Sequence, residues 1–246
     1  METDKLYWHR YIDEYERLVF SKLPNQFSKR TTLDILEIGV GSTPTTPSIE
    51  FLANRFRYQN TNIIGADILE PKSGWYSADN VSYVQLDQSD KAAVENFFAK
   101  YSFDLIIDDG SHQPEHQAIC LIAGMPALRE AGFYIVEDLH TSEDVGGCTP
   151  LRVLLAFEHL KRINIENGKL LPILASMSGF FFSCEDLCHL FNAVDDIYFY
   201  RRSTLPLHCC SGHCMSSEYN YVTLTCKCGR PLYLSGDSLT AIIRKR

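Results

Sequence analysis

Short apolar runs alternate with amphipathic stretches along the first 140 residues of the chain. The runs lie at 33–40, 62–67, 81–86, 103–108 and 132–137. Each is bounded by polar or turn-forming residues, which is typical of strands buried on both faces of a parallel sheet. Strands that alternate with helices predict βαβ units. We therefore expect an α/β protein with a doubly wound, mostly parallel sheet.

The segments between these runs carry helix-start signals. Thr46 followed by Pro47 predicts the N-cap and the first residue of a helix. Ser89 is predicted to cap a helix that runs through Lys100, and Pro114 is predicted to open the next helix. These helices would cover the faces of the sheet.

The second half of the chain is less regular. A helix is predicted from Pro150 to about residue 163, and strands are predicted at 178–183 and 196–201. A short helix near 185–193 would separate those two strands.

The composition changes after residue 203, where Cys, His, Ser and Gly dominate to about residue 217. Short strand-like pieces follow near 221–226 and 231–235. We therefore predict two units, an α/β domain over residues 1–204 and a small Cys-rich C-terminal appendage over residues 205–246.

The overall composition is that of a globular chain. It has 246 residues, of which 45% are hydrophobic and 22% are charged, and its net charge is -8. Without a basic cluster, a surface that follows nucleic-acid phosphates is not expected. No apolar run is long enough to cross a membrane, and the charged start lacks the features of a secretory signal. We expect a soluble, cytoplasmic protein that acts on a small molecule, and its oligomeric state stays open.

Acidic residues mark the carboxyl ends of the five predicted strands. They are Glu37, Asp67, Asp87, the pair Asp108 and Asp109, and the pair Glu137 and Asp138. In an open parallel sheet, ligands bind outside the carboxyl ends of the strands. A single acid there would be read as a helix cap, but five acidic strand ends at one edge favour a ligand site.

The first of these strands leads into a glycine turn. Gly39 and Gly41 are present, but Pro44 stands where a dinucleotide-binding turn has its third glycine. An acid-lined crevice would also repel a pyrophosphate. It suits a cationic ligand that carries an ammonium group and ribose hydroxyls, and S-adenosylmethionine combines these groups with a sulfonium.

Several sequence blocks around the strand ends resemble those of known methyltransferases. Residues 36–41 (LEIGVG) resemble the glycine-rich first motif of the class I S-adenosylmethionine-dependent methyltransferases. Five further blocks resemble the metal-dependent sugar O-methyltransferases of macrolide biosynthesis, the mycinamicin type. These blocks are residues 3–5, 9–11, 86–90 (LDQSD), 103–112 (FDLIIDDGSH) and 134–142 (YIVEDLHTS). The resemblance implies a Rossmann-like, seven-stranded sheet. It also implies Mg²⁺-assisted methyl transfer to a hydroxyl of a sugar-like or natural-product small molecule.

The same resemblance implies roles for individual residues at the cofactor site. Glu37, Gly39 and Gly41 would hold the methionine end of S-adenosylmethionine, Asp67 its ribose, and Asp87 with Gln88 its adenine side, and Asp108 is a further cofactor-binding candidate.

The two acidic pairs are candidates for a metal site. Asp108 and Asp109 precede Glu137 and Asp138 by about 29 residues, and adjacent parallel strands would bring the two pairs together. Hard oxygen ligands in a half-open site favour Mg²⁺. The spacing leaves open which of Asp108 and Asp109 binds the metal.

Two histidines follow the acidic pairs. Imidazole titrates near neutral pH and can accept the proton of a hydroxyl whose pKa a metal has lowered. His140 is the first candidate for this base and His112 is the second.

The cysteines suggest a second metal. Four of the nine, namely Cys210, Cys214, Cys226 and Cys228, could hold a structural Zn²⁺ in the tail. The alternatives are that these cysteines are free thiols or form disulfides.

Two other functions also stay open. One is a methyltransferase that uses no metal, and the other is a catalytically degenerate methyltransferase-like module that acts through its Cys-rich tail.

Overall fold

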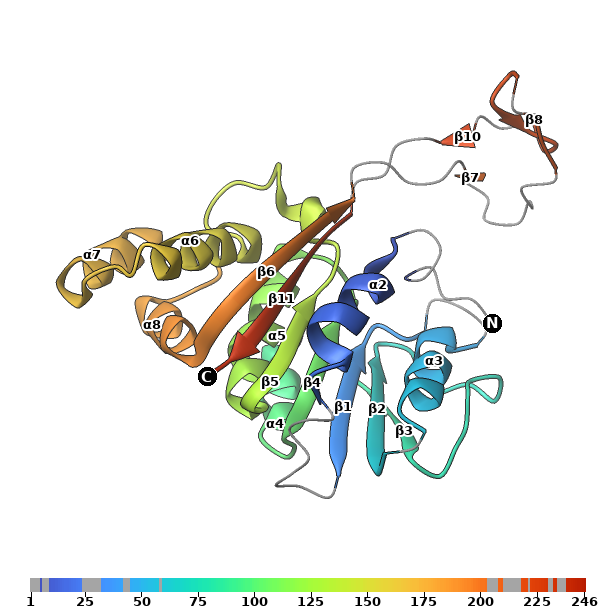
Figure 1. The fold of residues 1–246 in the computed structure, drawn as a ribbon, viewed down its shortest axis with the longest axis horizontal. Coiled ribbons are helices and arrows are strands. Elements are labelled where there is room, and N and C mark those ends of the chain that lie inside the picture. Colours follow the sequence, from blue (N-terminus) through green and yellow to red (C-terminus); the bar gives the residue numbers. More distant parts are fainter. Residues whose placement is uncertain are drawn as a thin grey trace.

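A seven-stranded sheet forms the centre of the protein (Figure 1). The computed structural model describes residues 5, 9–23, 32–41, 45–57, 59–202, 208–209, 218–220, 222–229, 232–233 and 238–246. The strands are β1 (Leu33–Ile38), β2 (Thr61–Asp67), β3 (Val81–Gln85), β4 (Phe103–Asp108), β5 (Leu128–Val136), β6 (Val194–Arg202) and β11 (Ser238–Lys245). Their order is β3-β2-β1-β4-β5-β11-β6, and β11 alone in this sheet runs antiparallel to its neighbours. The predicted α/β fold with seven strands is confirmed.

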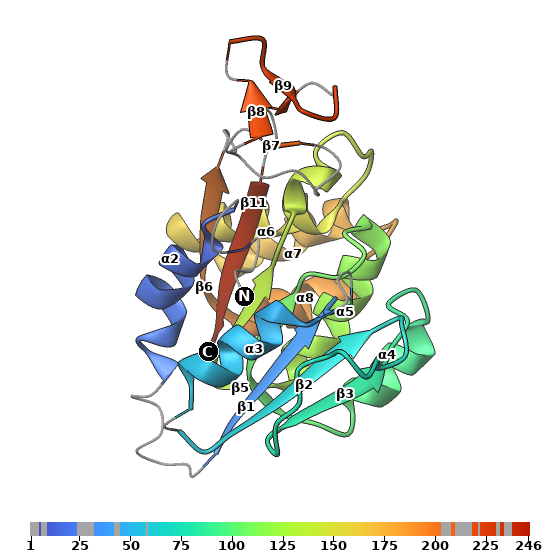
Figure 2. The ribbon, with the colours of Figure 1, turned by 90° about the vertical axis from the view of Figure 1, so that its right-hand side faces the viewer.

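Helices cover both faces of this sheet (Figure 2). On one face pack α2 (Tyr11–Tyr15), the π-helical turn η1 (Glu16–Phe20) and α3 (Pro47–Arg55). On the other pack α4 (Lys91–Phe98), α5 (Pro114–Ala127), α6 (Pro150–Arg162), α7 (Asn167–Met177) and α8 (Cys184–Ala193). Within the described ranges, no helix is both long and apolar enough to cross a membrane. Each face of the sheet has its own apolar core, which is why the strands are continuous apolar runs.

The pleat of the strands sends alternate side chains to opposite faces. In β4, Leu105 and Ile107 lie in the core beneath α2 and α3, whereas Ile106 lies in the core on the α5 side. Phe133 and Ile135 of β5 also belong to the α2 side. From residue 105 in β4 and residue 133 in β5, odd-numbered positions therefore face α2, and the same alternation separates Asp108 from Asp109.

Two local predictions are wrong. Asp90, not Ser89, caps α4, because the Asp90 carboxylate accepts a hydrogen bond from the backbone N–H of Ala93 at 3.0 Å. Residues 178–183 form a turn closed by the bridge between Gly179 and Phe182 instead of a strand. The apolar run there is folded back on itself because Gly179 and Phe180 both have positive φ angles, of 112° and 54°. The preceding helix, α7, has no counterpart among the predicted elements.

The strand β11 corrects the predicted domain boundary. It lies in the main sheet, where Ala241 pairs with Val136 of β5 and Ser238 pairs with Arg202 of β6. The predicted appendage over 205–246 therefore ends too late, because its last residues complete the sheet. A chain segment that pairs with two core strands cannot be a separate unit.

Residues 203–237, here called the Cys-rich insert, connect β6 to β11. Since β6 is parallel to β5, the insert leaves the sheet at its carboxyl edge. Its described parts include four short strands: β7 (His208–Cys209), β8 (Tyr219–Asn220), β9 (Thr225–Cys226) and β10 (Leu232–Tyr233). Cys226 is buried and Cys228 is exposed, whereas Cys210 and Cys214 lie outside the described residues. The zinc site thus stays a prediction.

Candidate functional site

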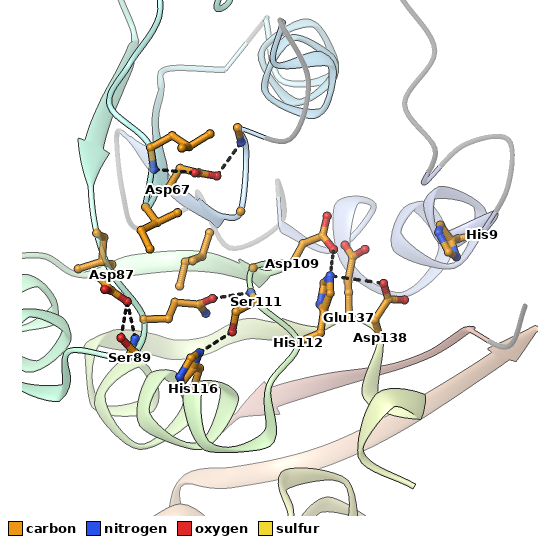
Figure 3. Close-up of a pocket in the computed structure, with 18 residues that line it drawn as sticks. His9, Asp67, Asp87, Ser89, Asp109, Ser111, His112, His116, Glu137 and Asp138 are labelled. Atoms are coloured by element: carbon orange, nitrogen blue, oxygen red, sulfur yellow. Dashed lines mark hydrogen bonds and ion pairs between the residues drawn. The ribbon is translucent and has the colours of Figure 1, made fainter. Parts of the chain in front are cut away.

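A cleft of about 520 Å³ lies at the carboxyl ends of the parallel strands. Of the predicted site residues, it is lined by Gly39, Gly41, Asp67, Asp87, Gln88, Asp109, His112, Glu137 and Asp138. Figure 3 shows Asp67 and Asp87 on one side of this cleft and His9 on the opposite side. Asp109, His112, Glu137 and Asp138 lie between them. Every predicted strand end but the first therefore contributes an acid to this cleft.

The glycine turn after β1 forms one wall of the cleft. Gly39 has a φ of +89°, and a Cβ there would lie 2.0 Å from the backbone oxygen of Asp109, so only glycine fits. The Asp67 carboxylate accepts hydrogen bonds from the backbone N–H groups of Gly41 at 2.7 Å and of Leu69 at 2.9 Å. Asp67 thus holds the glycine turn with one oxygen and the loop after β2 with the other, and it still faces the cleft.

Gln88 and Asp87 shape the predicted adenine side. The Gln88 amide donates to Asp108 Oδ1 at 2.8 Å and accepts from the backbone N–H of Ser111 at 2.7 Å. Because the chain uses both ends of this amide, Gln88 acts mainly as a brace between two loops. Hydrogen bonds from the hydroxyl and backbone N–H of Ser89 lower the pKa of Asp87, which stays charged at the cleft wall.

Asp109, His112 and Asp138 form a cluster near the centre of the cleft. His112 Nε2 lies 3.9 Å from Asp109 Oδ1 and 3.7 Å from Asp138 Oδ2, and one ligand atom from each residue lies within 4.8 Å of the others. His112 and Asp138 both adopt left-handed backbone conformations, with φ of 56° and 53°. The Thr141 hydroxyl lies 2.9 Å from the carbonyl oxygens of both residues. Such backbone strain persists where surrounding structure enforces it, commonly at functional sites.

Lys5 lies buried behind this cluster. Its Nζ donates to Asp109 Oδ2 and, at 2.7 Å, to Glu137 Oε1, and it lies 3.5 Å from Glu37 Oε1. The hydroxyl of Tyr15 also donates to Glu137 Oε1, at 2.8 Å. Lys5 therefore engages one oxygen of Asp109, while the other oxygen faces His112.

One ammonium faces three carboxylates, those of the buried Glu37 and Glu137 and of the partly buried Asp109, so negative charge stays uncompensated. Burial raises the pKa of Glu137 and of Asp109, and the charge of Lys5 offsets this only in part. Burial likewise raises the pKa of Glu37 to about 7. Burial alone would lower the pKa of Lys5, but the charges of these three carboxylates hold it well above its usual value. A further cation at the cluster would reduce the repulsion.

The structure separates the two members of the first acidic pair. Asp108 sits at an even-numbered position and so lies on the α5 side of the sheet, where it accepts from Gln88 and lies 3.5 Å from the Tyr134 hydroxyl. Burial raises its pKa to about 6. Asp109 lies on the opposite side, with Lys5 and the cluster. The pleat thus favours Asp109 over Asp108 as a metal ligand, and Asp108 does not line the cleft.

Two other predicted site residues lie outside the cleft lining. Glu37 is buried on the α2 side next to Lys5, which suggests that it supports the cluster from behind. His140 lies on the far side of Asp138, with Nδ1 3.9 Å from Asp138 Oδ1. Of the two histidines proposed as the base, the lining therefore includes His112 and leaves out His140.

Sequence reasoning gave no role to several residues that complete the site. Lys5, Tyr11 and Tyr15 reach the acidic cluster from the N-terminal segment, and His9 lines the cleft. The resemblance at 3–5 and 9–11 marked Lys5, His9 and Tyr11, whereas no sequence signal marked Tyr15. No periodicity marks a lysine or a tyrosine hydroxyl that bonds a carboxylate more than 100 positions away.

The residues present suit a divalent cation. Asp109 and Asp138 supply carboxylate oxygens and His112 an imidazole nitrogen, and all three are partly exposed to the cleft. Oxygen ligands with a single imidazole are a donor set for Mg²⁺ or Mn²⁺. The cleft also suits S-adenosylmethionine, because Gly41 leaves the Asp67 carboxylate uncovered, where a Cβ would lie 2.8 Å from it.

The sheet order with its antiparallel β11, the glycine turn and the acidic strand ends define the fold of the class I S-adenosylmethionine-dependent methyltransferases. No protein-family model matches the chain. Its structure resembles that of MycE, a methyltransferase of the mycinamycin biosynthetic pathway solved with Mg and SAH, with a TM-score of 0.57 at 18% identity over 95% of this chain and 48% of MycE. A complex of MycE with Mg, SAH and mycinamycin VI gives a TM-score of 0.54 at 20% identity.

The sequence is similar to that of curated sugar O-methyltransferases. It is 31% identical over 138 residues to the 8-demethyl-8-(2-methoxy-alpha-L-rhamnosyl)-tetracenomycin-C 3'-O-methyltransferase of Streptomyces olivaceus, covering 55% of this chain and 33% of that protein. It is 30% identical over 111 residues to the mycinamicin VI 2''-O-methyltransferase of Micromonospora griseorubida, covering 44% of this chain and 27% of that protein. The matches therefore span 33% or less of these two relatives' lengths. The predicted resemblance to this group is confirmed.

Proposed function

We propose that the chain is an S-adenosylmethionine-dependent O-methyltransferase that acts on a hydroxyl of a sugar-like or natural-product small molecule with the help of a divalent cation. The observation that carries this proposal is the meeting of the Asp109, His112 and Asp138 cluster with the Gly39 to Gly41 turn in one cleft. The similarity to sugar O-methyltransferases supports the class of acceptor.

Bound in this cleft, S-adenosylmethionine supplies a methyl group activated by its sulfonium. Asp67 can accept hydrogen bonds from the ribose hydroxyls, since each carboxylate oxygen has a lone pair beyond the one used by the chain. Asp87, charged and partly exposed, faces the adenine side. The glycine turn keeps side chains out of the space between these groups.

Asp109 and Asp138 would hold Mg²⁺, which at this position lowers the pKa of an acceptor hydroxyl. Lys5, which is itself held by Glu137, braces Asp109 from behind, so that one carboxylate oxygen stays directed into the cleft. Two imidazoles lie near Asp138 and are the candidate bases for the hydroxyl proton: His140, and His112 in the case where the cation does not take its Nε2 as a ligand. The remaining contribution of the protein is orientation of the two reactants.

The test is methyl transfer from S-adenosylmethionine to a panel of glycosylated natural products, detected by mass spectrometry with Mg²⁺ and with EDTA. Asp138→Asn should keep the fold and lose nearly all turnover. Asp144→Asn, which removes an exposed carboxylate from the same segment, is the matched control and should be unaffected. His112→Ala and His140→Ala identify the base by which of the two loses turnover while retaining metal.

One observation favours a second candidate, a methyltransferase that uses no metal. Lys5 already pairs with Asp109 and Glu137, so the chain itself supplies part of the positive charge that these acids need. Full methyl transfer in EDTA, with the same product, would establish this alternative. A chain that binds no S-adenosylmethionine by calorimetry would exclude both.

A further inference from the structure

The acidic residues of the site receive hydrogen bonds from the N-terminal segment. The Tyr11 hydroxyl donates to Asp138 Oδ1 at 2.8 Å, and the Tyr15 hydroxyl donates to Glu137 Oε1 at 2.8 Å. Both tyrosine side chains are fully buried. The helix α2 thus presents two hydroxyls, four residues apart on one helix face, to the two consecutive acids that follow β5.

Packing alone does not account for these hydroxyls. A phenyl ring would fill nearly the same space, and a buried hydroxyl costs free energy unless it finds a partner. Each hydroxyl lies 2.8 Å from an oxygen of a carboxylate, which can only accept when it is ionised, so both phenols act as hydrogen-bond donors.

The two hydrogen bonds have different consequences. Glu137 Oε1 is also held by Lys5, so Tyr15 is a second anchor for a carboxylate that is already fixed. Asp138 lies in the metal-binding cluster, and the terminal torsion of an aspartate has a broad, shallow profile. With Oδ1 held by Tyr11, Asp138 Oδ2 is directed toward His112 Nε2, 3.7 Å away.

We propose that Tyr11 is a positioning residue that fixes the Asp138 carboxylate in the direction needed to bind the divalent cation. The inference rests on the proposed metal-assisted function and adds to it a residue that is not itself a metal ligand. Hydrogen-bond partners of this kind orient ligands and raise metal affinity. Tyr11 acts through Asp138 and needs no contact with either substrate.

The test is a titration of the full chain with Mn²⁺ alone, followed by calorimetry or by the electron paramagnetic resonance signal of free Mn²⁺. Tyr11→Phe should weaken Mn²⁺ binding by about 10-fold or more, as is usual for the loss of a ligand's hydrogen-bond partner. The matched control is Tyr200→Phe, because the half-buried Tyr200 ring packs edge-on against Tyr11 at 6.3 Å between centroids. The control should bind Mn²⁺ as the wild type does.

A double-mutant cycle ties the effect to Asp138. If Tyr11 acts through this carboxylate, Tyr11→Phe should weaken Mn²⁺ binding no further in an Asp138→Asn background. In turnover, Tyr11→Phe should lower kcat and leave the KM for S-adenosylmethionine unchanged. If Tyr11→Phe is folded and binds Mn²⁺ with wild-type affinity, the positioning role is wrong while the proposed function stands. If the wild type itself binds no Mn²⁺, the metal-assisted function is wrong and this inference falls with it.

Two further variants keep the test decisive should Tyr11→Phe fail to fold. Placing 4-fluorophenylalanine at position 11 fills the volume of the hydroxyl without donating a hydrogen bond. Placing 4-aminophenylalanine there restores a donor. Weak Mn²⁺ binding by the first and recovered binding by the second support the proposal, whereas equal binding by both overturns it.

Discussion

The Asp67 carboxylate has two roles, one in the stability of the fold and one in cofactor binding, and two measurements on one variant can separate them. The chain uses one oxygen to hold the glycine turn through the backbone N–H of Gly41 and the other to hold the loop after β2 through that of Leu69, and the proposed function uses the carboxylate to bind ribose. In Asp67→Asn, one oxygen can still accept a hydrogen bond, but the new amide group is turned toward the second N–H donor. The variant thus loses one charge-assisted hydrogen bond and places two donors face to face.

The structure sets the expected size of both effects. Because a hydrogen bond to a charged group contributes about 1.5–3 kcal/mol, Asp67→Asn should lower the free energy of unfolding by about 2–3 kcal/mol. Affinity for S-adenosylmethionine should fall by roughly 10- to 100-fold, since each factor of ten corresponds to about 1.4 kcal/mol. Asp67→Ala removes both backbone hydrogen bonds and should be the less stable of the two variants.

Urea unfolding followed by circular dichroism measures the first effect, and calorimetry with S-adenosylmethionine measures the second. Asp79→Asn is the matched control, because it removes an exposed carboxylate from the loop between β2 and β3. Wild-type stability of Asp67→Asn would refute the role of Asp67 in the turn. A loss of stability with unchanged affinity would show that Asp67 does not bind the ribose.

Three further outcomes are expected. Burial raises the pKa of Glu37 from 4.5 to about 7, so across this pH window the folded state keeps a proton that the unfolded state releases. The free energy of unfolding should therefore decrease as pH rises through the window. Glu37→Gln should flatten this slope in urea titrations at several pH values. An unchanged slope would show that Glu37 does not cause the pH dependence. Thr141→Val, which removes the hydroxyl beside two carbonyl oxygens of the cluster, should lower the free energy of unfolding by about 1 kcal/mol and weaken Mn²⁺ binding, whereas Thr141→Ser should not. If the Cys-rich insert binds zinc, elemental analysis should find one equivalent and chelation should leave the helical circular dichroism intact, because the sheet has its own core; a zinc-free native protein would rule the site out.

The order of strands and helices from residue 33 to about residue 140 was readable from the sequence because its causes are local, whereas α2 and η1 before it were not predicted. A strand buried between two helix layers must be apolar on both sides, and residues 33–38, 61–67 and 103–108 show this directly. The meeting of the strand-end acids was predictable as well. Parallel strands place their carboxyl ends at one edge whatever the details of packing.

The second half was less predictable because its elements depend on partners distant in sequence. The segment 238–245 is a strand because the gap between β5 and β6 offers hydrogen bonds on both sides. From the sequence alone, it continues a Cys-rich tail. The three phenylalanines at 180–182 read as a strand, but positive φ angles at Gly179 and Phe180 make them a turn.

Within the site, the sequence determined which residue types gather, and the tertiary structure decided which of them face one another. Alternation along β4 shows that Asp108 and Asp109 point to opposite faces, but it does not tell which face carries the metal cluster. That is decided by α2, whose Tyr11 and Tyr15 side chains, with Lys5 before the helix, reach the acids on one face only. Contacts across more than 100 residues follow from the packing of whole layers, and no local pattern in the sequence records them.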